Sequence, residues 1–243
     1  RKPREFTWYS GLVLLVICLG FGFTGYLLPW DDVSFFATKI GLDIASKMPV
    51  FGEAAASLLR GGHNIGQGTL SRFFVIHVAL LPLLCLGLMG LHLLFVQMHG
   101  MSEPGYFKKL EAAKRTYEKF FPNFFLKDLL VWLLALNGLA ALVTLYPWGL
   151  GPEADPFGAA PIGIKPEWYF LAPFQFLKLV PPQVGPIEGE LFGALLMVLA
   201  CSGMVIVPFF DKGESADKAK IATYYGLVLL LGIIAFTIWG ALS

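Results

Sequence analysis

The stretch FFVIHVALLPLLCLGLMGLHLLFV, from Phe73 to Val96, decides the fold class of this chain. Its 24 residues include no Asp, Glu, Lys or Arg. A helix needs about 20 apolar residues to cross the hydrocarbon core of a bilayer, and lipid offers no hydrogen bonds to an open backbone. The stretch therefore predicts a membrane-spanning helix, in which Pro82 is expected to introduce a kink.

Four further apolar runs have a similar length. They are Thr7–Trp30, Leu126–Leu145, Leu191–Phe210 and Ala222–Leu242. Of the 243 residues, 56% are hydrophobic and 14% are charged, which is typical of a polytopic membrane protein. We expect an all-α membrane protein with five transmembrane helices, in which Pro29 and Pro208 stand at helix ends. The net charge of +1 gives no indication of a nucleic-acid partner.

Basic residues concentrate at three places along the chain. They lie before the first span, between or beside the second and third, and between the fourth and fifth: Arg1, Lys2, Arg4, Lys108, Lys109, Lys114, Arg115, Lys119, Lys127, Lys212, Lys218 and Lys220. Such loops face the cytoplasm or its equivalent. The N-terminus is therefore expected on this negative side, and the loops 31–70 and 146–190 on the positive side.

The two positive-side loops contain further patterned segments. Ser34–Lys47 carries apolar residues at helical spacing and predicts a helix lying flat on the membrane interface. Glu53–Arg60 predicts a second short helix. Glu167–Leu179 is aromatic and apolar but too short to cross a bilayer.

His77 and His92 lie 15 residues apart on the second span. In a regular helix this spacing corresponds to a rise of about 22 Å and a rotation of about 60° past four turns, so both rings lie on roughly one face near opposite leaflets. Imidazole is a good axial ligand for haem iron. The alternative is that each histidine is hydrogen-bonded independently to a neighbouring helix. Gly11 and Gly25, 14 residues apart on the first span, either make room for flat macrocycles or serve close helix packing.

Several motifs occur in the same order across nearly the whole chain and resemble cytochrome b of the quinol:cytochrome c and quinol:plastocyanin oxidoreductases. They are Lys2–Trp8, Thr24–Trp30, Leu59–Gly62, Thr69–Phe74 leading to His77, Leu91–Phe95, Asp155–Phe157 and Pro166–Tyr169. The 15-residue histidine spacing is more similar to the chloroplast and cyanobacterial branch. In that branch the last three spans usually form a separate subunit, whereas here they are fused to the earlier ones.

The resemblance implies that the chain forms part of a di-haem cytochrome b helix bundle, with two b haems in series across the membrane. His77 would ligate the low-potential haem near the positive side, and His92 the high-potential haem near the negative side. Arg72 would hold a haem propionate, and Gly11 and Gly25 would make room for the macrocycles.

Two haems with paired histidine ligands need four histidines. His63 lies in a loop and His99 follows the second span, so neither is expected to face a haem. We therefore expect that a separate polypeptide, or an upstream segment, supplies two spans and the two other ligands.

Glu167 has two readings from the residues alone. It is either a proton acceptor in apolar surroundings or the ordinary acidic start of a helix. The resemblance favours the first reading and implies a quinol-oxidising site. Tyr169 would offer a hydroxyl there, Pro166 and Trp168 would shape the pocket, and Ala37 would lie on the opposite wall.

Lys127 and Asp128, at the start of the third span, resemble a pair that binds quinone on the negative side. The alternative is a charged interfacial cap. The mitochondrial members of the family carry a histidine where this chain has Gln97, which leaves this second quinone site less complete.

The resemblance also implies partners and a location. The partners are a Rieske iron–sulfur protein, a c-type cytochrome, membrane lipid and a second copy of the complex; no nucleic acid is expected. The chain would be an integral multi-pass protein of a bacterial inner or thylakoid-type membrane. We expect three parts, 1–98 with haem ligands, 99–125 as a connecting loop, and 126–243 as a C-terminal domain.

Two other classes of function compete with electron transfer. One is a transporter without haem, in which Asp128, Glu167 and the histidines relay protons, and the other is a structural membrane anchor. A relay requires acidic residues in the middle of the membrane. Asp128 and Glu167 lie at the edges of spans, which favours the electron-transfer interpretation.

Overall fold

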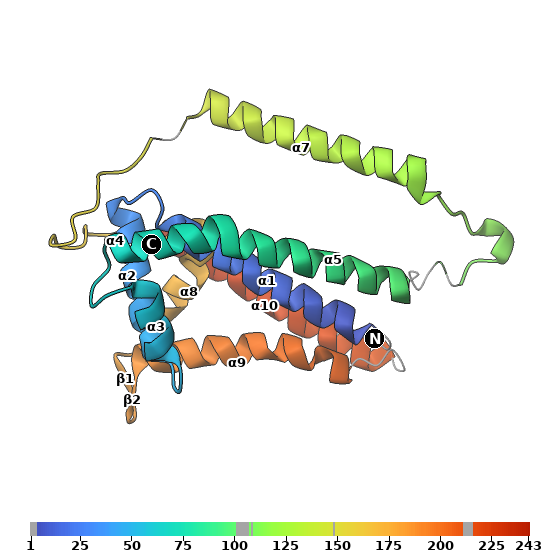
Figure 1. Ribbon diagram of the computed structural model, residues 1–243. Helices are drawn as coiled ribbons and strands as arrows, with labels where there is room; N and C mark the ends of the chain where they lie inside the picture. The colour runs from blue at the N-terminus through green and yellow to red at the C-terminus, as the bar shows by residue number, and fades with distance from the viewer. Residues whose placement is uncertain (1–3, 101–106, 108, 148, 211–215) are drawn as a thin grey trace. The chain divides into compact units, whose positions relative to one another are not determined.

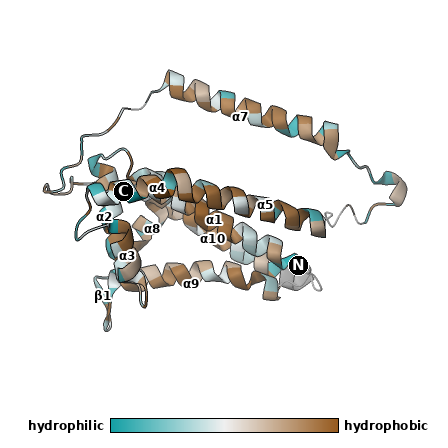
Figure 2. Ribbon diagram, in the orientation of Figure 1, coloured by the Kyte–Doolittle hydropathy of each residue, from teal (hydrophilic) through white to brown (hydrophobic). Residues whose placement is uncertain are grey.

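The computed structural model describes residues 4–100, 107, 109–147, 149–210 and 216–243. Five helices in this part of the chain are long and apolar enough to cross a membrane, as expected (Figure 1). They are α1 (Glu5–Tyr26), the continuous helix Gln67–His99, α7 (Phe125–Leu145), α9 (Gly189–Phe210) and α10 (Ala216–Leu242). Hydrophobic residues dominate their surfaces (Figure 2). Of the basic residues used above to assign the two sides, four lie outside the described residues: Arg1, Lys2, Lys108 and Lys212.

The first span ends four residues before the expected boundary. Helix α1 stops at Tyr26, and a turn follows that contains Pro29. Trp30 then adopts a left-handed backbone conformation with φ of 55°, which cannot continue a right-handed helix. The apolar run is thus longer than the helix, because hydropathy does not indicate where the backbone turns.

The second span is not a uniform α-helix. It consists of α4 (Gln67–Val75), a π-helical turn η1 (Ile76–Leu80) and α5 (Leu81–His99). The backbone N–H of Leu81 donates to the carbonyl of Ile76, five residues earlier. Pro82 comes two residues after the end of this turn and brings no N–H of its own to the helix. The irregularity expected at Pro82 is therefore present as a π-turn, and His77 lies within it.

The helices expected in the positive-side loops are also present. Helix α2 (Asp32–Ser46) begins with a capping box, in which the Ser34 amide donates to Asp31 Oδ1 at 2.8 Å and the Asp31 amide donates to Ser34 Oγ at 3.1 Å. Helix α3 (Gly52–Arg60) ends at Gly61, whose φ of 73° suits a residue without a side chain. The capping box explains where α2 begins, and Gly61 explains where α3 ends.

Helix α8 (Trp168–Leu179) precedes a small antiparallel hairpin of β1 (Gln183–Val184) and β2 (Ile187–Glu188). Lys47, at the end of α2, forms ion pairs with Glu188 at 2.5 Å and Glu190 at 2.7 Å. Hydrogen bonds to these two carboxylates raise the pKa of Lys47. The ammonium group therefore stays charged at neutral pH and ties α2 to the hairpin.

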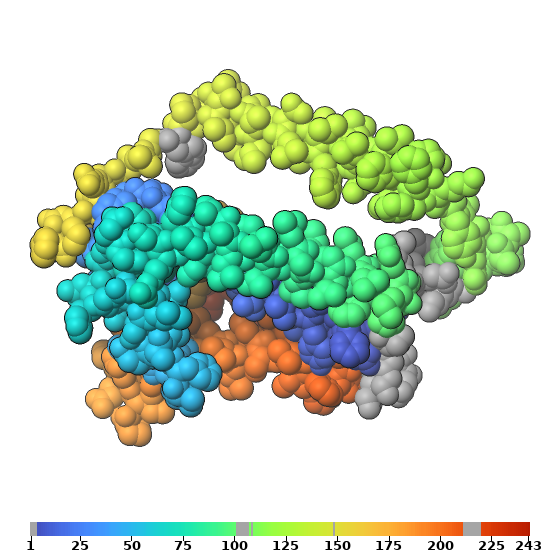
Figure 3. Space-filling view, in the orientation of Figure 1, coloured from blue at the N-terminus to red at the C-terminus, as the bar shows by residue number. Residues whose placement is uncertain are grey.

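The chain forms two compact units, 1–99 with 151–243, and 100–150. In the first unit, α1 packs along α5 (Figure 3), and α8 packs against α10. Its buried apolar cluster joins the end of α1 to α2 and α4, and consists of Leu27, Phe35, Phe36, Leu42, Ile65, Phe73 and Ala154. The second unit holds the short helices η2 (Ala112–Lys114) and η3 (Phe120–Phe124) as well as α7. The three-part division expected from the sequence stays a prediction.

Pro208 lies inside α9, two residues before the helix ends at Phe210, and not beyond its end. Because proline has no N–H, the carbonyl of Met204 lacks its helical donor. The indole Nε1 of Trp8 on α1 donates to this oxygen at 2.8 Å, and the Tyr9 hydroxyl donates to the next carbonyl, that of Val205, at 3.2 Å. The proline is thus accommodated by a side chain from a neighbouring span.

Replacing Trp8 by phenylalanine is expected to destabilise the first unit by about 1–3 kcal/mol, because it leaves the Met204 oxygen without a donor in an apolar environment. Thermal unfolding in a fixed detergent measures this loss. Tyr9→Phe is the matched control with a smaller expected effect, since the Val205 carbonyl retains Phe209 N–H as its helical donor by position. Equal losses in the two variants would contradict the special role of the Met204 carbonyl.

Candidate functional site

His77 and His92 both turn their rings toward α1 and each meets a hydroxyl there. The Thr24 Oγ1 lies 3.0 Å from His77 Nδ1, and the Ser10 Oγ lies 2.8 Å from His92 Nδ1. The other ring nitrogen of each histidine, Nε2, has no protein hydrogen bond among the described residues. An imidazole held through one nitrogen with the other left open is the arrangement that axial metal ligation requires.

Gly25 and Gly11 lie directly against these two rings. A Cβ atom built on Gly25 would come within 2.5 Å of His77 Cε1, and one on Gly11 within 3.4 Å of His92 Cε1. Glycine at position 25 is therefore needed for the imidazole itself to approach α1, while position 11 is less crowded. That these glycines also make room for macrocycles stays a prediction.

The π-turn explains how a 15-residue spacing on one helix matches a 14-residue spacing on the other. Each turn of π-helix takes up one residue more than a turn of α-helix. The extra residue between His77 and His92 is absorbed in η1, so the two rings meet Thr24 and Ser10, which are 14 residues apart on α1. Regular helix geometry predicted a rotation of about 60° between His77 and His92. With the π-turn, the two rings are instead related by nearly the same rotation as Thr24 and Ser10 on α1.

Arg72 lies on α4, exposed, one turn before His77. Its Nη1 donates to the carbonyl of Leu58, and its Nε would lie 2.9 Å from a Cβ on Gly61. The guanidinium group is thus packed on the loop between α3 and α4. Contact with a haem propionate stays a prediction.

The other two histidines occupy different surroundings. His63 is exposed in the loop between α3 and α4. His99 ends α5, and its backbone carbonyl accepts a hydrogen bond from Arg4 at 3.4 Å. Neither ring meets a hydroxyl and a glycine as His77 and His92 do.

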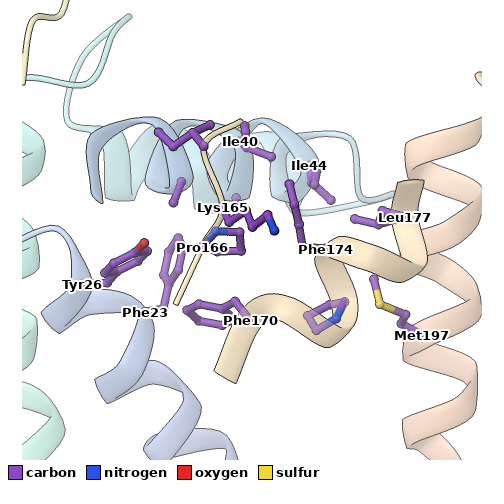
Figure 4. A pocket seen from close by; sticks show the side chains of 14 residues that line it. Phe23, Tyr26, Ile40, Ile44, Lys165, Pro166, Phe170, Phe174, Leu177 and Met197 are labelled. Atoms are coloured by element: carbon purple, nitrogen blue, oxygen red, sulfur yellow. The ribbon is translucent and has the colours of Figure 1, made fainter. Parts of the chain in front are cut away.

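A cavity of about 220 Å³ lies between α2, α8 and the end of α1 (Figure 4). Its walls are largely apolar and aromatic: Phe23, Ala37, Ile40, Pro166, Phe170 and Phe174 are among the lining residues. The structure thus brings the predicted residues Ala37 and Pro166 into one cavity, with Ala37 on α2 facing the segment before α8. The shape and apolar lining suit a flat, hydrophobic ring compound.

Glu167, Trp168 and Tyr169 follow Pro166 at the start of α8. Glu167 is the last residue before the helix and is exposed, rather than partly buried as expected. Trp168 is also exposed, at 70%. These two side chains are not part of the cavity lining and lie beside it, next to Pro166.

The Tyr169 ring packs on α1 and not into the cavity. A Cβ on Gly22 would lie 3.4 Å from its Cε2, and its ring centroid lies 6.4 Å from that of Tyr26. Burial, followed by the negative charge of Glu167, raises the pKa of Tyr169. The phenol therefore stays protonated at neutral pH and is able to donate a hydrogen bond.

Two polar residues line the cavity that the sequence did not single out. The Tyr26 hydroxyl is buried without a hydrogen-bond partner among the described residues. Lys165 also lines the cavity, and its Nζ donates to the carbonyl of Ala241 at 3.4 Å. The position of Tyr26 in the quoted Thr24–Trp30 motif is the signal that could have identified it.

Lys127 and Asp128 belong to the second unit. Lys127 Nζ forms an exposed ion pair with Glu118 Oε1 at 2.5 Å, and Asp128 lies exposed in the first turn of α7. The predicted quinone contact of this pair is not tested by these contacts.

Ser10 and Thr24 were also missed by the sequence reasoning. A signal was present, since each immediately precedes one of the two glycines, giving Ser10-Gly11 and Thr24-Gly25 at the same spacing of 14. It was overlooked because hydroxyl residues in membrane helices commonly hydrogen-bond only their own backbone.

The chain matches two family models. Residues 1–156 match cytochrome b(N-terminal)/b6/petB, and residues 153–243 match cytochrome b(C-terminal)/b6/petD.

Individual relatives agree with these matches. A cytochrome bc complex cytochrome b subunit from Chlorobaculum thiosulfatiphilum is 42% identical over 98% of this chain and 54% of the relative. Cytochrome b from Solanum tuberosum is 31% identical over 95% of this chain and 56% of the relative. Cytochrome b from Myxine glutinosa is 34% identical over 86% of this chain and 52% of the relative. The chain thus spans about half the length of the curated relatives it matches.

A solved structure described as hyperthermophilic respiratory Complex III has a similar fold. Its TM-score is 0.74 at 25% identity, covering 99% of this chain and 64% of that chain. Together with the five apolar helices, these matches confirm an integral multi-pass membrane protein. The chain belongs to the cytochrome b/b6 family.

Proposed function

We propose that this chain is part of a bc-type quinol oxidoreductase. It would supply one axial ligand to each of two b haems and the walls of one quinol-binding pocket. The observation that supports the proposal is a pair of imidazoles, each in hydrogen-bond contact with a hydroxyl group of α1. His77 and His92 lie at two levels of one span, each held through Nδ1, and among the described residues Nε2 has no protein hydrogen bond. Two independent structural histidines would have no reason to repeat this arrangement.

The residues present fit a haem at each level. A neutral imidazole with an open Nε2 is a suitable ligand, and the apolar span around it excludes water. When bound, the two haems supply one-electron transfer across the membrane. His77 and His92 hold them at different depths, and the Arg72 guanidinium pairs with a propionate at the positive side.

The second ligand of each haem comes from a segment other than the described helices. His63 and His99 are placed differently from His77 and His92, so this chain offers one matching ring per level. The relatives' additional length supports such a segment. We propose that it contributes two spans with two histidines, either in a separate chain or in the same one.

Quinol oxidation takes place in the cavity beside α8. The apolar lining, including Ala37 and Pro166, binds the ring and tail of the quinol and keeps water away from it. Glu167 accepts a phenolic proton at the mouth and, being exposed, releases it to the positive side. Tyr169 remains a hydrogen-bond donor beside it, and Trp168 covers the rim.

The electrons leave this cavity in two directions. One would pass to a Rieske iron–sulfur protein and then to a c-type cytochrome or plastocyanin. The other would pass inward by way of the haems that His77 and His92 would hold. At the negative side a quinone is reduced near Lys127 and Asp128, with uptake of protons. Release on one side and uptake on the other build a proton gradient, in an energy-transducing membrane of the bacterial inner or thylakoid type and in a dimeric complex.

The proposal predicts that the purified complex, oxidised and then mixed with quinol, develops the sharp visible bands of reduced b haem. We expect two b haems for each copy of this chain, measured by pyridine haemochrome extraction. A quinol analogue that occupies the cavity without being oxidised is the control and suppresses the bands. Membranes containing the intact complex but no b haem would contradict the proposal.

A further inference from the structure

We propose that Ser10 and Thr24 are positioning residues that fix the tautomer of the two haem-ligating histidines and set the reduction potential of each haem separately. The inference rests on the proposed function, because it presumes that His92 and His77 bind iron. It concerns the hydroxyl groups of α1, whose contacts define which nitrogen of each ring carries hydrogen.

Counting hydrogens decides the direction of both contacts. A hydroxyl group has one hydrogen to donate. The Ser10 hydroxyl donates it to the carbonyl of Thr7 at 3.0 Å, and the Thr24 hydroxyl donates it to the carbonyl of Gly20 at 2.7 Å. With its hydrogen donated to the carbonyl, each hydroxyl accepts from the histidine at its other contact.

It follows that both histidines carry their hydrogen on Nδ1. His92 Nδ1 donates to Ser10 Oγ across 2.8 Å, and His77 Nδ1 donates to Thr24 Oγ1 across 3.0 Å. The lone pair is then on Nε2 in both rings, the atom that has no protein partner. A ring of the opposite tautomer would need the hydroxyl hydrogen for its Nδ1, and the hydroxyl would then lose its bond to the backbone carbonyl.

Burial makes these contacts persistent. Ser10 is 6% exposed and Thr24 5%, although most of the surface of α1 is open. No water competes for a hydroxyl at such a site in the apolar span, and the hydrogen bond is correspondingly strong in the low dielectric. The hydrogen bond from α1 therefore restricts the orientation of each imidazole ring.

Each hydroxyl is followed by the glycine on which the same ring lies. Gly25 allows His77 to come within reach of Thr24, whereas a Cβ on Gly11 would only touch the His92 ring, at 3.4 Å from Cε1. The chain thus carries one hydroxyl–glycine cradle for each histidine, repeated at 14 residues. The repetition argues against a chance contact of a single serine or threonine with its neighbour.

The cradles also affect the iron through the ring. A hydroxyl that donates to a carbonyl is a better acceptor, because hydrogen bonds in a chain polarise one another. Accepting from Nδ1–H shifts electron density toward Nε2 and makes the ligand more basic. A more basic ligand favours the oxidised, more positive iron, so each hydrogen bond lowers the potential of the haem on its own level.

The test uses Ser10→Ala and Thr24→Val in the complete complex, with a potentiometric titration followed in the b-haem bands. We expect Ser10→Ala to shift only the haem of His92 to a more positive potential, and Thr24→Val to shift only that of His77. The expected size is about a threefold or larger rise in the ratio of reduced to oxidised haem at a fixed ambient potential, as for the loss of one hydrogen bond. Each variant is the control for the other.

The conservative exchanges Ser10→Thr and Thr24→Ser keep a hydroxyl and are expected to keep both potentials. The low-spin electron paramagnetic resonance signal gives a second readout, since it reports the orientation of the axial rings. Both haems present with unmoved potentials and signals in Ser10→Ala and Thr24→Val would overturn this inference and leave the proposed function intact. A wild-type complex without b haem would instead refute the proposed function. If the alanine or valine variant loses its haem, retention in the matching conservative variant supports positioning, and loss in both overturns it.

Discussion

His92→Ala is expected to abolish the haem at the negative side while the haem of His77 remains. The imidazole of His92 is the only group at its level of the second span that combines an open nitrogen with a fixed orientation toward α1 in the described chain. An alanine offers no ligand, and the remaining histidine from elsewhere cannot hold a six-coordinate low-spin iron by itself. The complementary variant, His77→Ala, is expected to remove the other haem.

Haem content and a potentiometric titration of the purified complex measure this result. The wild type is expected to titrate in two steps, and each variant in one, with the high-potential step missing in His92→Ala. His63→Ala is the matched control, because that ring is exposed in a loop, and it should retain both steps. A normal two-step titration of His92→Ala would refute the assignment of this histidine as a ligand.

Glu167→Gln is expected to slow quinol oxidation at least tenfold while the content of both haems is unchanged. General base catalysis by a positioned carboxylate contributes typically 10²–10⁴-fold, and glutamine keeps the size of the side chain but cannot accept the proton. Glu167 is the residue immediately before α8, directly after Pro166 of the cavity wall. Its loss leaves the cavity in place, so the defect should appear in turnover and not in assembly.

Stopped-flow reduction of the b haems by quinol measures the rate in this variant. Glu53→Gln is a suitable control, since Glu53 is exposed on α3 and lies outside the cavity lining. Tyr169→Phe is expected to have a smaller effect than Glu167→Gln, because the phenol stays protonated and serves as a donor only. Unchanged turnover in Glu167→Gln would remove this carboxylate from the mechanism.

The spans could be predicted because transfer into lipid depends on composition over about 20 residues, which the sequence states directly. Helix α2 was predictable from helical spacing, although it begins at Asp32, two residues before the expected Ser34, because Asp31 and Ser34 form a capping box. The π-turn was not, because adding one residue to a helical turn leaves hydropathy unchanged, and Pro82 indicates a kink without its form. The same limit applies to Pro208, which remains within its helix because Trp8 satisfies the carbonyl that it leaves open.

The candidate site divides along similar lines. Ala37 and Pro166 line one cavity, and it was the family resemblance, not local patterns, that predicted them on facing walls. That this cavity binds quinol stays a prediction. The hydroxyls of Ser10 and Thr24 and the buried phenol of Tyr26 were not foreseen, since their roles depend on which helix packs beside them. The exposure of Glu167 is likewise a property of packing and not of its neighbours in sequence.

The π-turn has a consequence for how this span tolerates changes in length. One added residue in a regular helix rotates everything beyond it by about 100° and would carry one imidazole away from its partner. In η1 the surplus residue is confined to five positions, Ile76–Leu80, so the segments on either side keep their facing. An insertion or deletion in a membrane helix need not disrupt electron transfer between two redox centres if a single widened turn takes up the difference. The number of residues between two ligands is then a poor measure of the distance between them across the membrane.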